Sequence, residues 1–423
     1  MRIAVIGARG IPVPADHAGT RSAKGSNDES SQIREQVTLA SAATSGIEHY
    51  CAEMYPRIAA QGHTIDLFAR ASYTQQSWYH QSLSQGIRTI SLPCLNLRGA
   101  DAFISSALGA IASIFAPYDI VHFHALGPSL FSGLPAIASS SKVVVTCHGL
   151  DWQRAKWGKL SSRLIHLGEK MAVRYADEII VVSEALQDYF WKTYQRKTVY
   201  IPNAPATYEA SDPTAPYVHS LGLTPQRYVV FLGRLVPEKA PDLLLKAFRS
   251  LQPAGWKLVF VGKSSDTSSF TTNLLSLADQ DPNIIFTGEL SGSRLAEVVR
   301  GAGLFVLPSS LEGMPLSMLE AMQEGVPVLA SNIPPHQQLV GTDRGVLFQT
   351  HSLEDLIDRL QWSIEHPQEM TAFAQQAQEF IRLNYRWDRI TNDTIHLYES
   401  LAQRSPSSTA QPSGYHLSRH KSH

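Results

Sequence analysis

The chain contains 423 residues, of which 43% are hydrophobic and 17% are charged, and its formal net charge is -1. This length is enough for two domains with separate cores, and the composition is that of an ordinary globular protein. The near-neutral balance gives no general case for a nucleic-acid partner, and three widely spaced cysteines do not suggest a disulfide framework or a zinc cluster.

The N-terminal stretch, MRIAVIGARGIP, predicts a short buried strand followed by a glycine turn. Its apolar run is too short for a signal peptide and has no cleavage-site pattern. No segment reaches the ~18–20 apolar residues that a membrane span needs, so we expect a cytoplasmic protein. Gly7 and Gly10 do not complete the G-x-G-x-x-G dinucleotide fingerprint, which argues against an oxidoreductase.

Residues 14–45 form a polar, aperiodic insertion. Its composition favours a disordered segment over the alternative, a mobile lid. Regular structure resumes with SGIEHYCAEMYPRIAAQG, where Tyr50, Met54 and Ile58 recur at helical spacing and Gly62 ends the helix.

Two later strands carry histidines. In DIVHFHA, His122 and His124 point to the same side because side chains alternate along a strand. His124 is either a satisfied structural residue or a contact for an acceptor substrate. His148 follows directly on the buried strand VVVTC, at the edge where open α/β sheets bind ligands.

Residues 151–174 are rich in positive charge, with six cations against Asp151 and Glu169, a net charge of six minus two, or +4. The cations and the interleaved aromatic residues are Arg154, Lys156, Lys159, Arg163, Lys170, Arg174, Trp152 and Trp157. Such a segment favours an anionic lipid headgroup or a diphosphate-linked acceptor, with Asp151 and Arg154 as candidate contacts. An ordinary solvated helix face is the equal alternative.

The predicted domain boundary follows the strand in VYIPNAP. We assign 1–206 to a first domain, 207–227 to a Pro-, Ala-, Ser- and Thr-rich linker, and 228–385 to a second domain. The second domain opens with YVVFLGRLVPEKAPDLLLKAF, which predicts a strand, a glycine turn and a helix. The helix has Leu243, Ala247 and Leu251 on one face.

Two cations lie in the loop between this strand and this helix. Arg234 and Lys239 follow Gly233 in the pattern G-R-x-x-x-x-K. A diphosphate leaving group develops negative charge, which cations fixed in a dry site stabilise. Arginine adds bidentate contacts and lysine a point charge. Surface charge is the alternative for either residue taken alone.

The stretch 303–332, GLFVLPSSLEGMPLSMLEAMQEGVPVLASN, predicts a strand, loop, helix and strand in a parallel βαβ unit. Pro315 suits the first turn of the helix and Gly325 its C-terminal cap. The loop SSLEGMP lies where a strand ends and a helix begins, so its backbone N–H groups and the helix dipole favour an anion.

Two carboxylates, Glu312 in this loop and Glu320 on the helix, frame the same edge. Glu320 shares a helix face with Leu316 and leans toward the buried side, where a carboxylate can accept hydrogen bonds from two sugar hydroxyls. For an isolated pair, a turn residue and a solvated helix residue would be the better interpretation.

The larger pattern, S-x-E-G-M-P-L-S-x-L-E-A-M, resembles the signature of retaining glycosyltransferases of family four (glycosyl transferases group 1), and G-R-x-x-x-x-K matches that family as well. The resemblance spans about 1–401 apart from the insertion. It implies an α/β protein of the GT-B fold, with two Rossmann-like domains facing a cleft and a C-terminal helix, 386–402, that crosses back to the first domain. Residues 403–423 are predicted to be a disordered tail.

The resemblance also implies roles for individual residues. Glu312, together with the Gly313 and Met314 amides, would hold the donor sugar, and Glu320 would bind the nucleotide ribose. Arg234 and Lys239 would stabilise the departing nucleoside diphosphate. The implied catalytic residues are His148 and Glu312, and the remaining implied donor contacts are Gly10, Gly233, Gly288, Leu290, Pro315 and Leu316.

The expected activity is transfer of a sugar from a nucleoside-diphosphate sugar to a glycan or lipid-linked acceptor, as in bacterial polysaccharide or glycolipid synthesis. Nothing resembles an Asp-x-Asp metal motif, so no metal and no cofactor beyond the co-substrate are expected. The implied route is front-face attack assisted by the leaving phosphate. The basic segment favours contact with the inner membrane surface.

Two other classes of function stay open at this point. One is an epimerase or a phosphorylase on the same fold. The other is a non-catalytic nucleotide-sugar-binding scaffold, suggested by the long N-terminal insertion. The sequence also departs from the family pattern, with Ser45 in place of a glycine, Ala240 after Lys239, and Lys263-Ser264-Ser265 in a turn where relatives have a second glycine.

Overall fold

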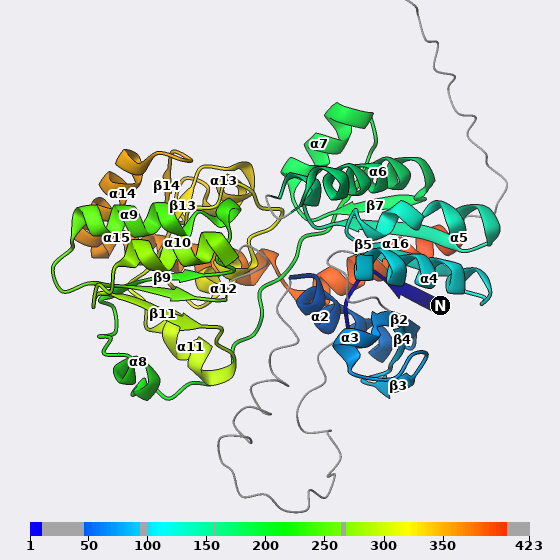
Figure 1. Ribbon diagram of the computed structural model, residues 1–423, viewed down its shortest axis with the longest axis horizontal. Helices are drawn as coiled ribbons and strands as arrows, with labels where there is room; N and C mark the ends of the chain where they lie inside the picture. The colour runs from blue at the N-terminus through cyan, green and yellow to red at the C-terminus, as the bar shows by residue number, and fades with distance from the viewer. Residues whose placement is uncertain (11–45, 94–99, 155–156, 264–267, 404–423) are drawn as a thin grey trace, which may run out of the picture.

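The computed structural model describes residues 1–10, 46–93, 100–154, 157–263 and 268–403. The predicted insertion and the tail beyond 403 lie outside these ranges. Figure 1 shows two lobes, each built on one sheet flanked by helices, with the first domain on the right and the second on the left.

Within the described residues, the first domain contains an eight-stranded sheet of order β3-β4-β2-β1-β5-β6-β7-β8. β3 is antiparallel to β4, and the other neighbours pair in parallel. The inner strands are mostly apolar and buried because helices cover both faces of a parallel sheet, and the polar exceptions include Asp66 of β2 and the two histidines of β5. The strands are β1 (Arg2–Ile6), β2 (Thr64–Arg70), β3 (Gln81–Ser84), β4 (Ile87–Leu92), β5 (Ile120–His124), β6 (Lys142–Cys147), β7 (Glu178–Val181) and β8 (Val199–Tyr200).

The helices of the first domain follow the predicted periodicity. Tyr50, Met54 and Ile58 are all buried on one face of α2, and the Ser183 hydroxyl accepts a hydrogen bond from the Leu186 amide at the start of α7. The helices are α2 (Gly46–Ala60), α3 (Ala71–Thr74), α4 (Ala100–Ile114), η2 (Pro128–Phe131), α5 (Gly133–Ala138), η3 (Asp151–Gln153), α6 (Lys159–Tyr175) and α7 (Glu184–Tyr194).

The second domain contains a parallel sheet of order β11-β10-β9-β12-β13-β14. Its central strands are fully apolar and buried, as predicted for 228–232 and 304–307. The strands are β9 (Tyr228–Leu232), β10 (Lys257–Val261), β11 (Ile284–Gly288), β12 (Leu304–Leu307), β13 (Val328–Ser331) and β14 (Val346–Phe348).

The buried face of helix α9 differs from the predicted one. Leu244, Leu245, Ala247 and Phe248 are buried, whereas Leu243 is only partly buried. The face is rotated because α14 and α10 also pack on α9. The helices of this half are α8 (Pro216–Ser220), η4 (Pro237–Lys239), α9 (Pro241–Leu251), α10 (Ser268–Ala278), α11 (Gly292–Arg300), α12 (Leu316–Gln323), α13 (Pro334–Val340), α14 (Leu353–Glu365) and α15 (Pro367–Asn384).

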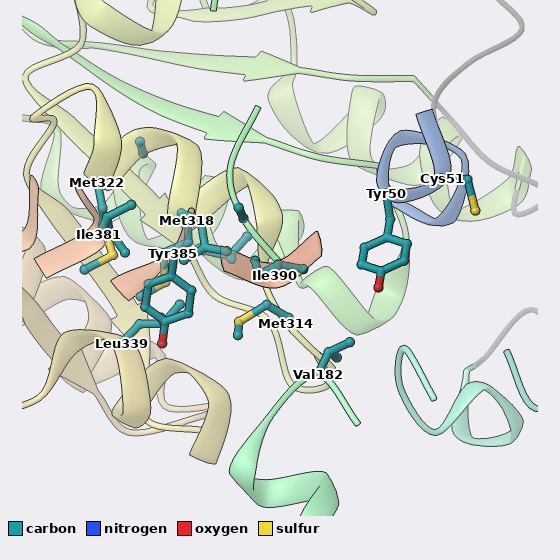
Figure 2. Close-up of a cluster of buried hydrophobic side chains, with 14 of the residues drawn as sticks. Tyr50, Cys51, Val182, Met314, Met318, Met322, Leu339, Ile381, Tyr385 and Ile390 are labelled. Atoms are coloured by element: carbon teal, nitrogen blue, oxygen red, sulfur yellow. The ribbon is translucent and has the colours of Figure 1, made fainter. Parts of the chain in front are cut away.

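Three methionines of the stretch 303–332 are buried in the core on the inner side of α12. Met318 and Met322 are fully buried and lie with Ile381 and Tyr385 of the α15 end (Figure 2). Met314 belongs to the same buried cluster, which also includes residues of the first domain and of the C-terminal helix (Figure 2). The motif therefore connects the core of the second domain with the junction between the domains.

The C-terminal helix α16 (Trp387–Gln403) leaves the second domain and packs on α2 of the first. The Trp387 indole donates a hydrogen bond to the Pro205 carbonyl at 3.0 Å, and Gln61 of the first domain donates one to Asn392 at 3.0 Å. This is the predicted crossing helix, and the predicted two-domain α/β fold is confirmed.

The stretch 207–227, predicted as a linker, has two parts. Its second half contains α8, which packs on α11, and Val218 and Leu223 are buried there. The Tyr217 amide donates a hydrogen bond to Glu297 of α11 at 2.9 Å. The segment that connects the two lobes is therefore the first half of the stretch.

Candidate functional site

Both sheets reverse their strand order at a point that faces the junction. In the first sheet this point lies between β1 and β5, and in the second it lies between β9 and β12. Ligands of open α/β sheets bind outside the carboxyl ends of the strands at such points. The loops after β9 and β12 contain Arg234, Lys239 and Glu312, which explains why the chain brings these distant segments together.

The two domains are in contact at these loops. A Cβ atom on Gly313 would overlap the carbonyl oxygen of His148, and one on Gly149 would lie 3.6 Å from the Gly313 amide nitrogen. A Cβ on Gly46, at the start of α2, would lie 3.2 Å from Leu316 Cδ1 at the start of α12. The predicted cleft is therefore narrow here, and the two glycines at its centre permit the approach.

Glu312 and Lys239 form an ion pair at this junction. Lys239 Nζ lies 2.6 Å from Glu312 Oε1, with the two side chains only 15% and 12% exposed. The Ser309 hydroxyl donates a hydrogen bond to the same oxygen at 2.8 Å. Burial alone would raise the pKa of Glu312, but the Lys239 ammonium outweighs it and holds that pKa below its ordinary value. Glu312 is thus an ionised carboxylate.

Two arginines from different domains face each other beside this pair. Burial and the nearby Arg154 guanidinium lower the pKa of Arg234. Arg154 belongs to the first domain and pairs with Asp151, its Nε lying 2.9 Å from Oδ1. Glu238 contributes negative charge to both arginines, yet in the described structure neither of its buried carboxylate oxygens has a hydrogen-bond partner.

Glu320 lies on α12 and meets the connection between the domains. The Tyr208 hydroxyl donates a hydrogen bond to Glu320 Oε2 at 2.9 Å. Burial raises the pKa of Glu320 to about 7, with the nearby Glu324 adding to the rise and the Tyr208 hydrogen bond opposing it. The two predicted glutamates therefore differ in charge near neutral pH, one ionised and the other close to its midpoint.

The predicted glycine contacts lie at the ends of the strands. Gly233 has φ +157, and a Cβ there would lie 3.0 Å from Lys239 Cδ. Gly288 ends β11 with φ +72, and Leu290 follows it at the edge of the same sheet. Pro315 immediately precedes α12. Gly10 ends the first described segment, but the close approach is at Gly7, where a Cβ would overlap the His124 carbonyl oxygen.

A row of buried rings runs from His148 into the first domain. His148 Nε2 lies 3.1 Å from His124 Nδ1, and His124 Nε2 lies 2.5 Å from the Tyr55 hydroxyl. Tyr55 is also 3.0 Å from His122 Nδ1, which lies 2.5 Å from the Tyr398 hydroxyl on α16. Burial lowers the pKa of His148 to about 4 and that of His122 to about 3. These imidazoles are therefore neutral near pH 7.

His124 itself is fully buried. Burial, with the adjacent His122 and His148 rings, holds its pKa well below the ordinary histidine value. Its ring nitrogens contact Tyr55 and His148, so His124 occupies the position of a satisfied structural residue, which is one of the two alternatives that the sequence left open. The alternation that placed His122 and His124 on one side of the strand is confirmed by their ring separation of 4.2 Å.

Trp152, one of the two tryptophans of the basic segment, points inward. The Trp152 indole donates a hydrogen bond to Glu169 at 2.9 Å and stacks on His166. Glu169 is fully buried and also accepts hydrogen bonds from Tyr189 and Tyr194. The alternation of charge and aromatic residues in the sequence therefore does not describe one exposed face, and Lys156 lies outside the described residues.

Other residues of the site carry no signal in the sequence. Tyr208 lies in the polar connection, and Glu238 belongs to the loop between the predicted cations. His336 is buried behind the Glu312 loop, where burial lowers its pKa to about 4. The one hint for Glu238 is its place directly before Lys239 in the sequence, which does not by itself predict a buried carboxylate.

The described residues contain no cluster of three His, Cys, Asp or Glu side chains placed to hold a metal ion. In the same part of the chain, no helix combines the length and the apolar character that a bilayer crossing requires. The fold and the junction define a two-domain α/β protein with cationic and acidic side chains where its two switch points meet.

Comparison with known proteins identifies the family. The profile "Glycosyltransferase Family 4" matches residues 44–205, and "Glycosyl transferases group 1" matches residues 219–380. The two matches adjoin and cover one domain each. The chain belongs to this family of glycosyltransferases of the GT-B type, as the motifs predicted.

Individual relatives agree with this assignment. A D-inositol 3-phosphate glycosyltransferase of Rhodococcus opacus is 26% identical over 84% of this chain and 85% of its own. The putative teichuronic acid biosynthesis glycosyltransferase TuaC of Bacillus subtilis is 30% identical over 57% of this chain and 60% of its own.

Solved structures share the fold. Sucrose-phosphate synthase from Thermosynechococcus elongatus superposes with a TM-score of 0.76 at 20% identity, covering 95% of this chain and 98% of that chain. HepE from Anabaena, in complex with UDP, gives a TM-score of 0.68 at 18% identity, covering 85% of this chain and 98% of that chain. HepE has also been solved with UDP-glucose.

Proposed function

We propose that this glycosyltransferase is a retaining enzyme that moves a sugar from a nucleoside-diphosphate sugar to a glycan or lipid-linked acceptor. One observation carries the proposal. Arg154, Arg234 and Lys239 converge from both domains on the ends of β6, β9 and β12. Cations fixed in a largely buried site stabilise the negative charge that develops on a departing diphosphate.

The acidic side chains of the site suit the sugar part of the donor. Sugar hydroxyls donate hydrogen bonds, and the buried Glu238 carboxylate has two oxygens that no described group satisfies. A buried polar group without a partner costs free energy, which a hydroxyl-bearing ligand would recover. The complexes of HepE with UDP and UDP-glucose make UDP-sugars the first donors to test.

The proposed chemistry needs no covalent intermediate. The C1–O bond to the diphosphate breaks while an acceptor hydroxyl forms the new bond from the same face, and its proton passes to the leaving phosphate oxygen. Lys239 and Ser309 already engage one oxygen of Glu312, which reduces the nucleophilicity of that carboxylate. Glu312 would instead hold Lys239 and the sugar in place.

His148 lies on the first-domain side of this site. It is neutral near pH 7, because burial lowers its pKa to about 4, and its carbonyl lies against Gly313. A neutral imidazole there offers a hydrogen bond to the sugar without adding charge. In this proposal the three side-chain cations stabilise the diphosphate charge, which a divalent ion does in metal-dependent transferases. No metal and no cofactor take part.

The acceptor is proposed from the relatives. The similarity to TuaC supports a role in cell-surface polysaccharide or glycolipid synthesis. Nucleotide sugars and lipid-linked acceptors meet at the inner face of a membrane, so we place the enzyme in the cytoplasm with peripheral membrane contact.

The test is transfer from UDP-sugars and other nucleotide sugars, followed by the anomeric configuration of the product by NMR. Arg234→Ala should lower kcat/KM by roughly 10²–10³-fold, the usual cost of removing one group that stabilises developing charge. Arg382→Ala is the matched control, because that guanidinium is exposed and pairs only with Glu379. An inverted product would overturn the retaining mechanism, and full activity of Arg234→Ala would overturn the site.

A further inference from the structure

The surface of the first domain has an unusual concentration of exposed large apolar side chains. Most of those exposed in the described structure lie on α4, α5 and α6 or directly after α4. They are Phe103, Ile111, Phe115, Leu134, Ile137, Leu160, Leu164 and Leu167. Single exposed apolar residues are normal, whereas a contiguous group marks an interaction surface.

These residues share one flank of the domain. α4 contacts α5, and α5 contacts α6 (Figure 1). The Phe103 ring of α4 packs against the Phe131 ring of η2, with 4.8 Å between the centroids. η2 therefore adds an aromatic side chain to the same flank. The most exposed members are Phe115 at 82%, Ile137 at 74% and Leu160 at 71%. We call this flank the α4–α5–α6 face.

The charge of this face has one sign. The exposed cations of α6 are Lys159, Arg163, Lys170 and Arg174. They are interleaved with Leu160, Leu164 and Leu167 along the outer side of the helix. The described residues of the three helices include two acids, of which Glu169 is fully buried and Asp101 pairs with Arg70 at 3.0 Å.

We propose that the α4–α5–α6 face docks on an anionic lipid bilayer. Leucine, isoleucine and phenylalanine side chains would enter the headgroup region, while the flanking lysines and arginines would meet the lipid phosphates. Apolar burial and attraction to anionic lipids together bind such a surface to a membrane without spanning it. Among the described residues these four cations form no ion pair, and the described parts of the three helices add no exposed unpaired acid, so the face matches the negative charge of such a membrane.

Charge argues against the other occupants of this face. A symmetric dimer through it would oppose the same four cations on both copies, and like charges across an interface are unfavourable. The segment 403–423 does not complement it either, since its sequence contains no Asp or Glu.

The position of the face suits the proposed reaction. α6 begins shortly after Arg154, which lies at the junction with Arg234 and Glu312. A membrane held along α6 would therefore lie near the acceptor side of the site. This link to a lipid-linked acceptor rests on the proposed function, whereas the docking itself does not.

The experiment is co-sedimentation of the full chain with lipid vesicles, without donor or acceptor. Phosphatidylcholine–phosphatidylglycerol vesicles should bind the protein in a manner that added salt weakens, and pure phosphatidylcholine vesicles should bind it much less. Ile137→Glu and Leu160→Glu should each abolish most of the binding. Leu83→Glu is the matched control, because Leu83 is 76% exposed on β3, away from these helices.

The contribution of charge is tested separately. Arg163→Glu and Lys170→Glu should each lower the vesicle partition coefficient by at least about fivefold, the worth of one surface cation near an anionic membrane. Lys246→Glu, on α9 of the second domain, should have no effect. Circular dichroism and thermal unfolding of every variant show that its fold is intact.

Three results would overturn the proposal. These are no binding of the wild type to anionic vesicles, equal binding to neutral vesicles, or equal losses in the Leu83→Glu control. A concentration-dependent dimer that Ile137→Glu dissociates would assign the face to a second copy instead. Because the assay contains no substrate, its failure would leave the proposed sugar transfer standing.

Discussion

Two glutamates of one loop-and-helix unit have opposite electrostatic surroundings. Glu312 is held ionised by Lys239 at 2.6 Å, while burial raises the pKa of Glu320 to about 7. Pairs of carboxyl groups whose environments separate their pKa values commonly divide the work of a site. Here the division would be between sugar and cation binding at Glu312 and ribose binding at Glu320.

This difference predicts a pH dependence of donor affinity. Ribose hydroxyls donate hydrogen bonds, so they prefer the ionised form of Glu320, which is lost as pH falls through about 7. One pH unit below its pKa only about a tenth of a carboxyl group is ionised. The dissociation constant for UDP-glucose, measured by calorimetry, should therefore rise several-fold from pH 8 to pH 6.

Glu320→Gln separates this group from others that titrate. The variant should bind UDP-glucose more weakly at pH 8 and show a flat profile from pH 8 to pH 6. Tyr208→Phe removes a hydrogen bond that lowers the Glu320 pKa, so its profile should shift to higher pH. An unchanged slope in Glu320→Gln would refute the assignment.

At the residue scale, sequence spacing identified the charged residues at the centre of the site but not the residues that surround them. The patterns around Arg234, Lys239 and Glu312 predicted which loops would meet, because these residues follow strands that are adjacent at the switch point. Tyr208 and Glu238 could not be found this way. The importance of Tyr208 depends on one hydrogen bond, and that of Glu238 on two buried carboxylate oxygens without a partner in the described structure, and only the tertiary structure defines either.

At the scale of elements, β5 acts as a link between His148 and α16. Its two histidines join the first domain's reaction-side loop to Tyr398 through hydrogen-bond contacts that also include Tyr55. Buried polar networks that are fully satisfied favour a single arrangement of their members. The crossing helix α16 therefore contacts both domains and, through this row of hydrogen-bond contacts, also restrains the position of His148.

We infer from this arrangement that His124 positions the His148 ring. His124→Asn removes the ring that lies 3.1 Å from His148 Nε2, and a small misplacement at a reacting centre costs up to ~10²-fold in rate. We expect kcat to fall by about tenfold to hundredfold while the KM for the donor changes little, because the proposed donor contacts come mainly from the second domain. Steady-state kinetics measure both quantities.

Tyr398→Phe is the matched variant at the other end of the row. It should lower the free energy of unfolding by about 0.5–1.5 kcal/mol, the net worth of one hydrogen bond, because His122 Nδ1 keeps its contact with Tyr55, and the effect on kcat should be much smaller. If His124→Asn also lost only stability, or if the donor KM rose in parallel, a role in positioning His148 would be excluded.

Element boundaries were predicted better than element faces. The apolar runs of β6, β9 and β12 and the periodicity of α2 determine strands and a helix almost alone. The buried face of α9 and the inward direction of Trp152 depend on partners far away in sequence, namely α14 for the helix and Glu169 for the indole. Spacing within one element does not reveal such partners.

At the scale of the whole molecule, the connection between the domains is hydrogen-bonded to α12, which bears Glu320, and to the end of α11. Gln323 donates a hydrogen bond to the Ala206 carbonyl at 2.9 Å, and Arg300 donates one to the Glu209 carbonyl at 2.8 Å. Tyr208 reaches Glu320 between them. In the proposed function, a nucleotide bound at Glu320 would therefore contact the same helix that holds the connection between the domains.

The contact between the domains at Gly313 predicts a separation of binding from transfer. A Cβ atom there would overlap the His148 carbonyl oxygen, so Gly313→Ala should push the two loops apart. Donor contacts of the second domain remain, whereas His148 withdraws from them. We expect the affinity for UDP-glucose to stay within about threefold and kcat to fall by on the order of 10²-fold, the cost of about 1 Å of misplacement.

Small-angle X-ray scattering with UDP-glucose should then give a larger radius of gyration for Gly313→Ala than for the wild type. Gly158→Ala is the control, because Gly158 has φ -66 and a Cβ there meets nothing within 4 Å. A Gly313→Ala enzyme with normal kcat would mean that transfer does not require this contact. The requirement for glycine at 313 would then come from the donor sugar, and affinity rather than rate would carry the loss.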